Sequence, residues 1–183
     1  MSMNTNHAMN TGEPSPHIRA AGNADEPAVR ALVFGVLRDY GLNPDPAATD
    51  RDLDDIECSY RSHGGGFDVM TTPDGTIIGT VGLMPLGDGR CELRKMYLAP
   101  AHRGRGLGRR LLMHALDRAR ALGFRRVELE TAAVLTEAIA LYRSFGFAPF
   151  TPDHLAPRCD QAYFLDLATS AAAPGAGAPG AGP

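Results

Sequence analysis

The most informative stretch of this chain is Arg103-Gly104-Arg105-Gly106-Leu107-Gly108. It lies between a strand-like run, 91–98, and a run with helical periodicity that begins near Leu107. Alternate glycines let the backbone turn sharply and approach a ligand without side chains in the way. The first N–H groups of the helix that follows have no intrahelical partner and suit an anion. The stretch therefore predicts a phosphate-binding loop.

Four arginines, Arg103, Arg105, Arg109 and Arg110, add full positive charges around the same loop. Together with the backbone they are suited to a pyrophosphate. The loop differs from a nucleoside triphosphate P-loop, because Arg109 and Arg110 stand where Lys and Ser or Thr would be expected. It also lacks the Gly-x-Gly-x-x-Gly opening, with an acidic residue further on, of dinucleotide-binding folds. The alternative interpretation is a glycine-rich turn with solvated arginines.

The flanks of the loop resemble the GCN5-related N-acetyltransferase (GNAT) superfamily. Glu92-Leu93-Arg94-Lys95-Met96-Tyr97-Leu98-Ala99-Pro100, the loop itself and Leu111-Leu112 resemble its acetyl-coenzyme A motif. Ala138-Ile139-Ala140-Leu141-Tyr142-Arg143-Ser144-Phe145-Gly146-Phe147 resembles its closing helix, with a Leu-Tyr and a Gly-Phe pair. The matches run from about 76 to 150. The resemblance implies an α/β (α+β) fold with a mixed, mostly antiparallel central sheet flanked by helices.

The resemblance also implies acetyl transfer from acetyl-coenzyme A to an amine in a ternary complex. Arg103–Gly108 and Arg109 would hold the pyrophosphate. In the superfamily, the strand before this loop carries a bulge and splays from the next strand, so that its backbone pairs with the pantetheine arm. Met96, Tyr97 and Leu98 match that position, with an N–H of Met96 or Tyr97 facing the thioester oxygen. The alternative for this strand is an ordinary buried strand.

Two residues are the candidates for proton transfer. Tyr142 occupies the position of the superfamily's tyrosine, whose phenol can protonate the departing thiolate. The alternative is a tyrosine packed on the core with its hydroxyl at the surface. Glu92 matches the general base of histone-modifying members, and strand alternation predicts that it shares a face with Arg94 and Met96. The alternative is a strand glutamate paired with a nearby arginine.

One position departs from the superfamily pattern. Many relatives carry Asn seven residues before the tyrosine, where it contacts the pantetheine arm, and this chain has Leu135. Hydroxyl groups of Thr131 or Thr136 are candidates to replace that contact.

Periodicity and turn residues predict the remaining elements. Pro73-Asp74-Gly75 is a turn signal between two strands, and Gly41, Gly123 and Gly146 each follow a helical run. The predicted strands are 17–20, 67–71, 76–86, 91–98, 127–131 and 162–167, and the predicted helices are 25–40, 49–60, 107–122 and 134–144.

The second of these helices carries an acidic cluster in a region that often shapes the acceptor site of relatives. A cationic amine would be attracted to it, but we expect a solvated helix face instead, because charge runs usually face water. The predicted helix cap is Thr49 or Asp50. The cluster comprises Asp50, Asp52, Asp54, Asp55 and Glu57.

Composition sets the outer limits. The 183 residues are 44% hydrophobic and suit one domain, expected at 17–167, between tails at 1–16 and 168–183 whose composition predicts disorder. A net charge of −3, with no aromatic residues interleaved among the loop arginines, argues against nucleic acid as a partner. No apolar run is long enough for a membrane span, and the sequence shows no metal-binding motif. Three scattered cysteines favour a reducing compartment, so we expect a cytoplasmic protein.

These features lead to two hypotheses. The first is an N-acetyltransferase with acetyl-coenzyme A as donor and a small-molecule primary amine as acceptor. A peptide or protein amine is the alternative acceptor. The second is a non-catalytic acyl-coenzyme A sensor. The presence of both Tyr142 and Glu92 favours the enzyme. Relatives are often dimers, so a homodimer is expected by analogy alone.

Overall fold

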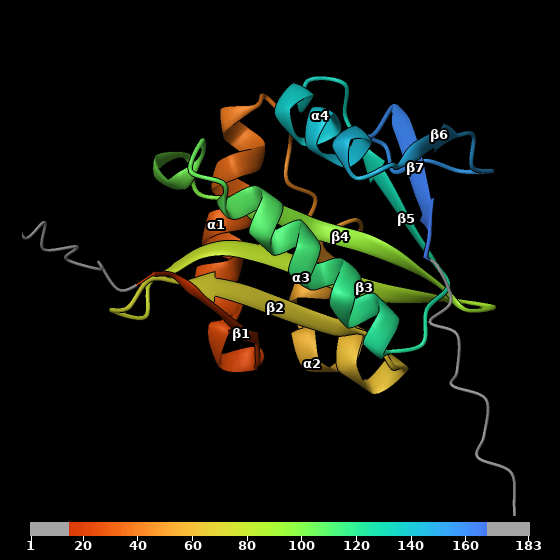
Figure 1. Cartoon of the computed structure of the whole chain (residues 1–183). Helices are drawn as coiled ribbons and strands as arrows, with labels where there is room; N and C mark the ends of the chain where they lie inside the picture. The colour runs from red at the N-terminus through yellow and green to blue at the C-terminus, as the bar shows by residue number, and fades with distance from the viewer. Residues whose placement is uncertain (1–14, 168–183) are drawn as a thin grey trace, which may run out of the picture.

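The computed structural model describes residues 15–167 (Figure 1). The predicted tail 168–183 and all but the last two residues of the predicted tail 1–16 lie outside the described residues.

The described strands form one sheet of seven strands in the order β1-β2-β3-β4-β5-β7-β6. Every neighbouring pair is antiparallel except β4 and β5, which run parallel. This arrangement confirms the expected mixed, mostly antiparallel sheet. The strands are β1 (His17–Ala20), β2 (Gly66–Thr71), β3 (Ile77–Gly87), β4 (Arg90–Leu98), β5 (Arg126–Thr131), β6 (Ala148–Phe150) and β7 (Gln161–Asp166).

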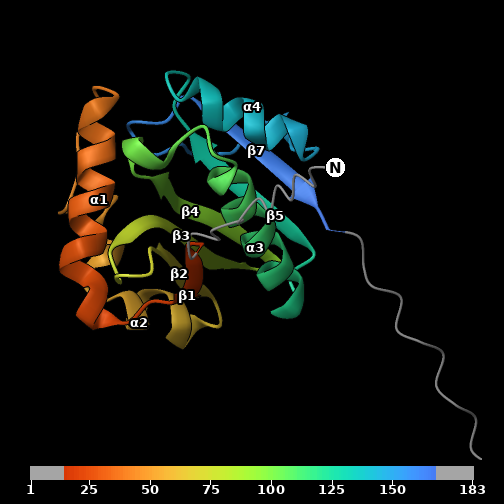
Figure 2. The ribbon, with the colours of Figure 1, turned by 60° about the vertical axis from the view of Figure 1, so that its left-hand side comes forward.

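Helices cover both faces of the sheet. They are α1 (Glu26–Asp39), α2 (Ile56–Tyr60), α3 (Leu107–Ala121) and α4 (Thr136–Ser144). Figure 2 shows α1 and α3 on opposite sides of the sheet. Apolar side chains of α1 and α2 pack with β2 in one core, whereas those of α3 and α4 pack with the central strands in a second core. The periodicity of each helix explains this, because its apolar residues lie on one face.

A β-bulge interrupts β4 just before the end of the strand. Thr80 of β3 pairs with Tyr97 and Gly82 pairs with Arg94, so two residues of β4, Lys95 and Met96, lie opposite one residue of β3. Lys95 has a φ of 51°, a left-handed conformation that non-glycine residues seldom adopt.

The bulge reverses the alternation of side chains along β4. Before it, Leu93 packs in the core under α3; after it, Met96 and Leu98 pack against that same core. Met96 therefore lies on the face opposite to Glu92 and Arg94, and the prediction that these three share a face was wrong. Strict alternation fails here because one inserted residue shifts the pattern by one position.

Beyond the first residues of β4, the sheet opens. Strand β4 pairs with β5 only from Arg90 to Glu92, opposite Arg126 to Glu128. Both strands continue past this point, and no further pairs between them occur within residues 15–167. The edge of β4 that faces β5 therefore lacks a strand partner from Leu93 to Leu98, as the resemblance predicts.

The predicted helix 49–60 was wrong in its first half. Only Ile56–Tyr60 is α-helical, and Arg51–Leu53 forms a short 3₁₀ turn. The helix begins after Asp55, whose side chain accepts a hydrogen bond from the Cys58 N–H at 2.9 Å. An N-cap of this kind satisfies an N–H that has no intrahelical partner. The predicted cap at Thr49 or Asp50 is thus replaced by Asp55.

Each of the other predicted elements begins and ends within two residues of the corresponding element in the structure. Strand β6, whose three residues pair with β7, was not predicted. A strand this short gives no alternation pattern that could reveal it.

Candidate active site

A cavity of about 540 Å³ lies where β4 and β5 separate. One end is formed by the loop before α3, and the other by the segment between β6 and β7. The residues that line it include Tyr40, Thr49, Glu92, Arg94, Lys95, Met96, Tyr97, Leu98, Arg103, Gly104, Gly108, Glu130, Thr131, Leu135, Glu137, Tyr142, Ala156, Arg158 and Cys159.

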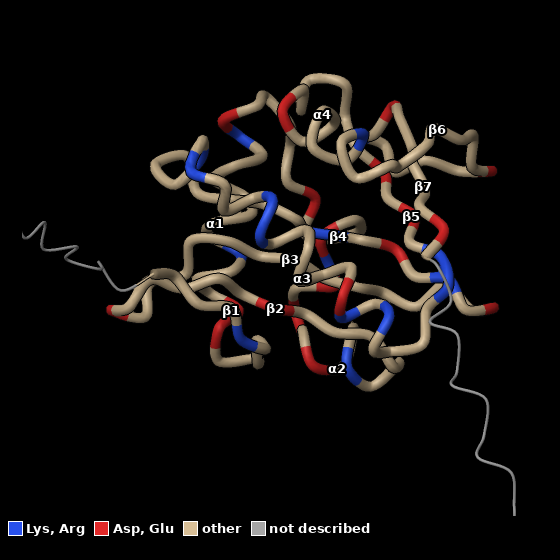
Figure 3. The backbone as a smooth tube through the Cα atoms, in the orientation of Figure 1, with Lys and Arg blue, Asp and Glu red and all other residues tan. Residues whose placement is uncertain are grey.

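The loop before α3 presents unpaired backbone donors. Gly104 and Gly106 have φ values of 71° and 77°, which glycine adopts without steric cost. The first hydrogen bond of α3 runs from the Arg110 N–H to the Gly106 carbonyl at 3.1 Å. The N–H groups from Gly106 to Arg109 therefore have no intrahelical acceptor, and they carry the positive end of the helix dipole. Figure 3 shows basic residues at this turn into α3.

Arg103 is fixed at the mouth of the cavity. Its Nε donates to the Leu98 carbonyl at 3.1 Å and its Nη1 to the Tyr40 hydroxyl at 3.2 Å. Its guanidinium lies over the Tyr40 ring, 5.1 Å from the centroid. The Nη2 atom of Arg103 is buried and has no hydrogen-bond partner among the described residues. A buried donor of this kind fits an anionic ligand such as a pyrophosphate.

The other loop arginines are more exposed. Arg105 and Arg109 lie at the surface, and the Arg109 guanidinium stacks on Phe145 at 4.8 Å from the ring centroid. Of the residues predicted to bind the pyrophosphate, Arg103, Gly104 and Gly108 line the cavity.

Met96, Tyr97 and Leu98 form the wall of the cavity along β4. This is the part of the strand that has no partner on the β5 side. Its backbone can accept an extended ligand in the way that a sheet edge accepts another strand. Leu135 and Thr131 line the opposite wall, whereas the Thr136 hydroxyl donates to Glu137 at 3.1 Å. Of the two threonines considered, Thr131 is the one on the cavity wall.

Tyr142 reaches the cavity from α4. Its side chain is 6% exposed, and its ring packs against Phe147 with 5.7 Å between centroids. Burial, and to a smaller extent the neighbouring Tyr97, raises the pKa of the Tyr142 phenol well above its usual value. A phenol with such a pKa stays protonated at neutral pH and is available as a proton donor.

Glu92 reaches the cavity from β4, with 23% of its side chain exposed. Its Oε1 lies 3.6 Å from the Arg94 Nε, so the alternative of a strand glutamate beside an arginine also holds. Burial raises the pKa of Glu92; Arg94 opposes this shift, and Glu130 adds to it. A raised pKa moves a carboxylate toward the range of a general base that works near neutrality.

Glu130 and Arg158 also line the cavity, although neither was predicted as a site residue. Glu130 lies on β5, and its Oε2 accepts the Ala156 N–H at 2.8 Å. Its signal was the alternation of β5, in which the buried Val127 and Leu129 alternate with the less buried Glu128 and Glu130. Arg158 lies in an irregular segment between β6 and β7 and had no periodic signal.

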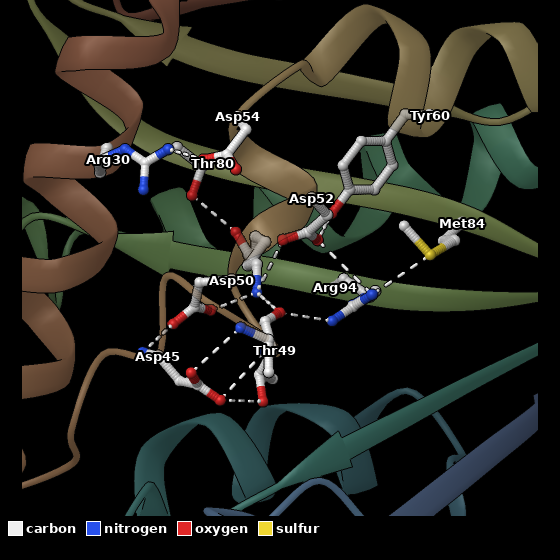
Figure 4. Close-up of polar contacts among 12 residues, drawn as sticks. Arg30, Asp45, Thr49, Asp50, Asp52, Asp54, Tyr60, Thr80, Met84 and Arg94 are labelled. Atoms are coloured by element: carbon white, nitrogen blue, oxygen red, sulfur yellow. Dashed lines mark hydrogen bonds and ion pairs between the residues drawn. The ribbon is translucent and has the colours of Figure 1, made fainter.

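Part of the predicted acidic cluster is buried beside this cavity, so the expectation of a solvated helix face was wrong for Asp50 and Asp52. Asp50 is 0% exposed, and the Asp52 side chain is 7% exposed. Both lie close to the Lys95 ammonium, at 2.5 and 3.3 Å. Figure 4 shows Asp52 directed toward Tyr60, whose hydroxyl donates to it. Asp54 and Asp55 are exposed, as predicted for a solvated face.

Residues 15–167 lack two kinds of feature. None of the helices in 15–167 is long and apolar enough to cross a membrane. No group of three or more His, Cys, Asp or Glu side chains in that range is arranged to hold a metal ion.

Comparison with known proteins identifies the family. A family model described as "Acetyltransferase (GNAT) family" matches residues 33–147. The chain belongs to the GNAT family. It is 39% identical over 143 residues to "Uncharacterized N-acetyltransferase YjgM" of Escherichia coli, covering 75% of this chain and 85% of that protein. The family makes this GNAT protein an acetyl-CoA-dependent acyltransferase.

Solved structures share the fold. An acetyltransferase of the GNAT family from Staphylococcus aureus superposes with a TM-score of 0.78 at 19% identity, covering 83% of this chain and 99% of that one. YncA, an acetyltransferase from Salmonella typhimurium solved with its cofactor acetyl-CoA, superposes with a TM-score of 0.64 at 26% identity. That match covers 88% of this chain and 99% of YncA.

Proposed function

We propose that this GNAT acetyltransferase transfers the acetyl group of acetyl-CoA directly to a primary amine of a small molecule, in a ternary complex, and that residues 17–167 form the acetyltransferase domain. The observation that carries the proposal is that one cavity unites the glycine-rich loop, the unpaired edge of β4, Glu92 and Tyr142. Each of these features suits one task of an acyl transfer between two bound substrates.

Donor binding uses the loop end of the cavity. The N–H groups of Gly106 to Arg109 and the buried Nη2 of Arg103 would hold the pyrophosphate. Met96, Tyr97 and Leu98 would hold the pantetheine arm along the open edge of β4, with an N–H of Met96 or Tyr97 directed at the thioester oxygen.

The transfer step needs one base and one acid. Glu92 would accept a proton from the ammonium form of the acceptor, directly or through water, and the free amine would attack the thioester carbonyl carbon. A C–N bond forms, the C–S bond breaks, and Tyr142 would give its proton to the departing thiolate. The acylated nitrogen then loses its surplus proton to the Tyr142 phenolate, which restores the phenol and leaves the neutral amide. The raised pKa of Glu92 supports its role as the base, and the position of Tyr142 in the same cavity supports its role as the acid.

The far end of the cavity supports a small acceptor. This end, which we call the acceptor end, is lined by Thr49, Ala156 and Cys159. Glu92 and Glu130 place two carboxylates there, and these attract a cationic amine. A wall of this kind suits a compact amine better than a protein loop.

The experiment is a thiol-release assay with acetyl-CoA against amino acids, polyamines, aminoglycosides, arylamines and short peptides. Coenzyme A binding is followed in parallel by thermal shift, because a ligand that binds only the folded state raises its stability. Turnover of a small amine supports the proposal. Turnover of peptides alone would make the protein a peptide acetyltransferase, and binding of coenzyme A without turnover of any amine would favour a sensor.

A further inference from the structure

Asp50 receives hydrogen bonds from three separate segments of the chain. Its Oδ1 and Oδ2 accept hydrogen bonds from the Arg158 guanidinium at 2.6 and 2.8 Å, in the bidentate geometry typical of an arginine and a carboxylate. Its Oδ1 also accepts from the Lys95 Nζ at 2.5 Å, and its Oδ2 from the Asp45 N–H at 2.8 Å. Figure 4 shows Asp50 beside Asp45 and Thr49.

All three charged groups of this cluster are withdrawn from water. Exposed fractions of the side chains are 0% for Asp50, 2% for Lys95 and 14% for Arg158. Removing one member of such a buried group leaves an uncompensated charge, which is strongly unfavourable. Loss of the Asp50 charge would leave two cations, Lys95 and Arg158, with Asp52 as the other carboxylate near Lys95.

Lys95 connects Asp50 to the bulge of β4. Its left-handed backbone is costly for a residue with a Cβ, so contacts around it must hold it there. The Lys95 Nζ is bound by Asp50 and by the Thr49 carbonyl at 2.9 Å, and the Lys95 carbonyl accepts from the Thr80 hydroxyl at 2.6 Å. The bulge precedes Met96 and Tyr97, which form the donor wall of the cavity.

Arg158 connects Asp50 to the acceptor end. It lies in the irregular segment between β6 and β7, whose residues Ala156, Arg158 and Cys159 line the cavity. One buried carboxylate is thus bonded both to the bulge that shapes the donor wall and to the segment that shapes the acceptor wall.

We propose that Asp50 is a positioning residue, which ties the segment 156–159 to the bulge of β4 and so sets the geometry between donor and acceptor. The inference rests on the proposed function only in naming that segment as the acceptor wall.

The test uses the chain's own cysteines as reporters. Cys159 lies in the tied segment and is partly exposed, Cys91 is buried under α3, and the exposed Cys58 is removed by Cys58→Ser. In this background we compare Asp50→Asn with Asp54→Asn, which changes an exposed aspartate that is paired with Arg30. Iodoacetamide labelling of each cysteine is followed by mass spectrometry, and coenzyme A affinity by calorimetry.

We expect Asp50→Asn to raise the labelling rate of Cys159 by about tenfold or more, because the released segment opens locally. Labelling of Cys91 should stay at its original rate, and the coenzyme A dissociation constant should rise several-fold because the bulge is loosened. Asp54→Asn should change none of these values. Arg158→Met should raise Cys159 labelling while leaving coenzyme A affinity unchanged, and Lys95→Met should weaken coenzyme A binding.

Unchanged Cys159 labelling in Asp50→Asn would overturn the proposal. Equal increases at Cys159 and Cys91 would also overturn it, because they would indicate general loss of stability. If Asp50→Asn does not fold, Arg158→Met and Lys95→Met provide the test. The proposal then fails if both variants change only Cys159 labelling, or if both change only coenzyme A affinity. Neither labelling nor coenzyme A binding requires turnover of an amine, so failure of the proposed function would be seen separately in the thiol-release assay.

Discussion

Glu92 and Tyr142 line one cavity from two different elements, the strand β4 and the helix α4. The pKa of each group is raised by burial. For the carboxylate this shift increases its strength as a base, and for the phenol it keeps the proton on the oxygen at neutral pH. Glu92 is therefore the candidate for the base, and Tyr142 is a protonated group in the same cavity that is the candidate for the acid.

The pH dependence of the reaction should report on Glu92. Because the pKa of Glu92 is raised, kcat/KM should fall on the acid side at a pH above the ordinary carboxyl value of 4.5. Glu92→Gln should lower kcat/KM by about a hundredfold at neutral pH and remove that acid limb. Initial rates of thiol release from pH 4 to 9 measure both effects. A variant with the full rate and the same pH profile would exclude Glu92 as the base.

Glu130 should contribute to acceptor binding. Glu130→Gln removes a carboxylate from the acceptor end, so the KM for the amine should rise by about tenfold while the KM for acetyl-CoA stays constant. The matched control is Glu128→Gln on the same strand, whose carboxylate pairs with Arg90 and Arg126. Equal effects of the two substitutions on the amine KM would show that Glu130 has no special part in binding.

Gly106 should be required for coenzyme A binding because of its backbone conformation, and not because a larger side chain would clash with its neighbours. A Cβ at Gly106 would meet no atom within 4 Å, but the φ of 77° would strain an alanine by about 1–2 kcal/mol. Gly106→Ala should therefore weaken coenzyme A binding by distorting the first turn of α3. Gly123→Ala is the control, because Gly123 has a φ of 83° and equally open surroundings at the other end of α3. Calorimetric titration should show weaker binding for Gly106→Ala alone.

Acid should destabilise the protein partly through Asp50. Burial acts to raise the pKa of Asp50, but hydrogen bonds from Arg158, the Asp45 N–H and Lys95 outweigh it and lower the pKa to about 2. Because the pKa of Asp50 is lower in the folded state than in the unfolded state, its charge stabilises the fold at pH values above the unfolded-state pKa of 3.8. This contribution is lost as the pH falls toward 2. It amounts to roughly 2 kcal/mol.

Urea unfolding between pH 5 and pH 2 measures this effect. The wild type should lose roughly 2 kcal/mol more of its unfolding free energy over this interval than Asp50→Asn, which has no carboxyl group to titrate at this position. Parallel losses in the two proteins would contradict the assignment.

The donor end of the cavity could be predicted from the sequence because its signals are local. The glycines of 104–108 and the apolar period of α3 lie within one short stretch, and the resemblance placed Tyr142 and Glu92 near that loop. Gly104, Gly108, Glu92 and Tyr142 line one cavity in the structure, while the roles of the residues stay proposals.

The acceptor end could not be predicted because its contacts join distant segments. Asp50 and Arg158 are far apart in the sequence, and the fold brings them together as an ion pair. The acidic run from Asp50 to Glu57 gave a correct signal of charge but no sign that Asp50 would be buried. The resemblance implied a bulge in this strand, but its position at Lys95 could not be located for a related reason, since what holds a lysine in the left-handed region is its partners in other segments.

The direct test of the proposed acyl transfer is the comparison of Tyr142→Phe with the wild type. Turnover of acetyl-CoA with the amine found in the panel assay is measured together with the dissociation constant of coenzyme A. We predict that kcat falls by about a hundredfold, because the thiolate leaves without its proton donor, while the dissociation constant stays within about twofold of the wild type. A variant that keeps the wild-type kcat would contradict the proposed mechanism.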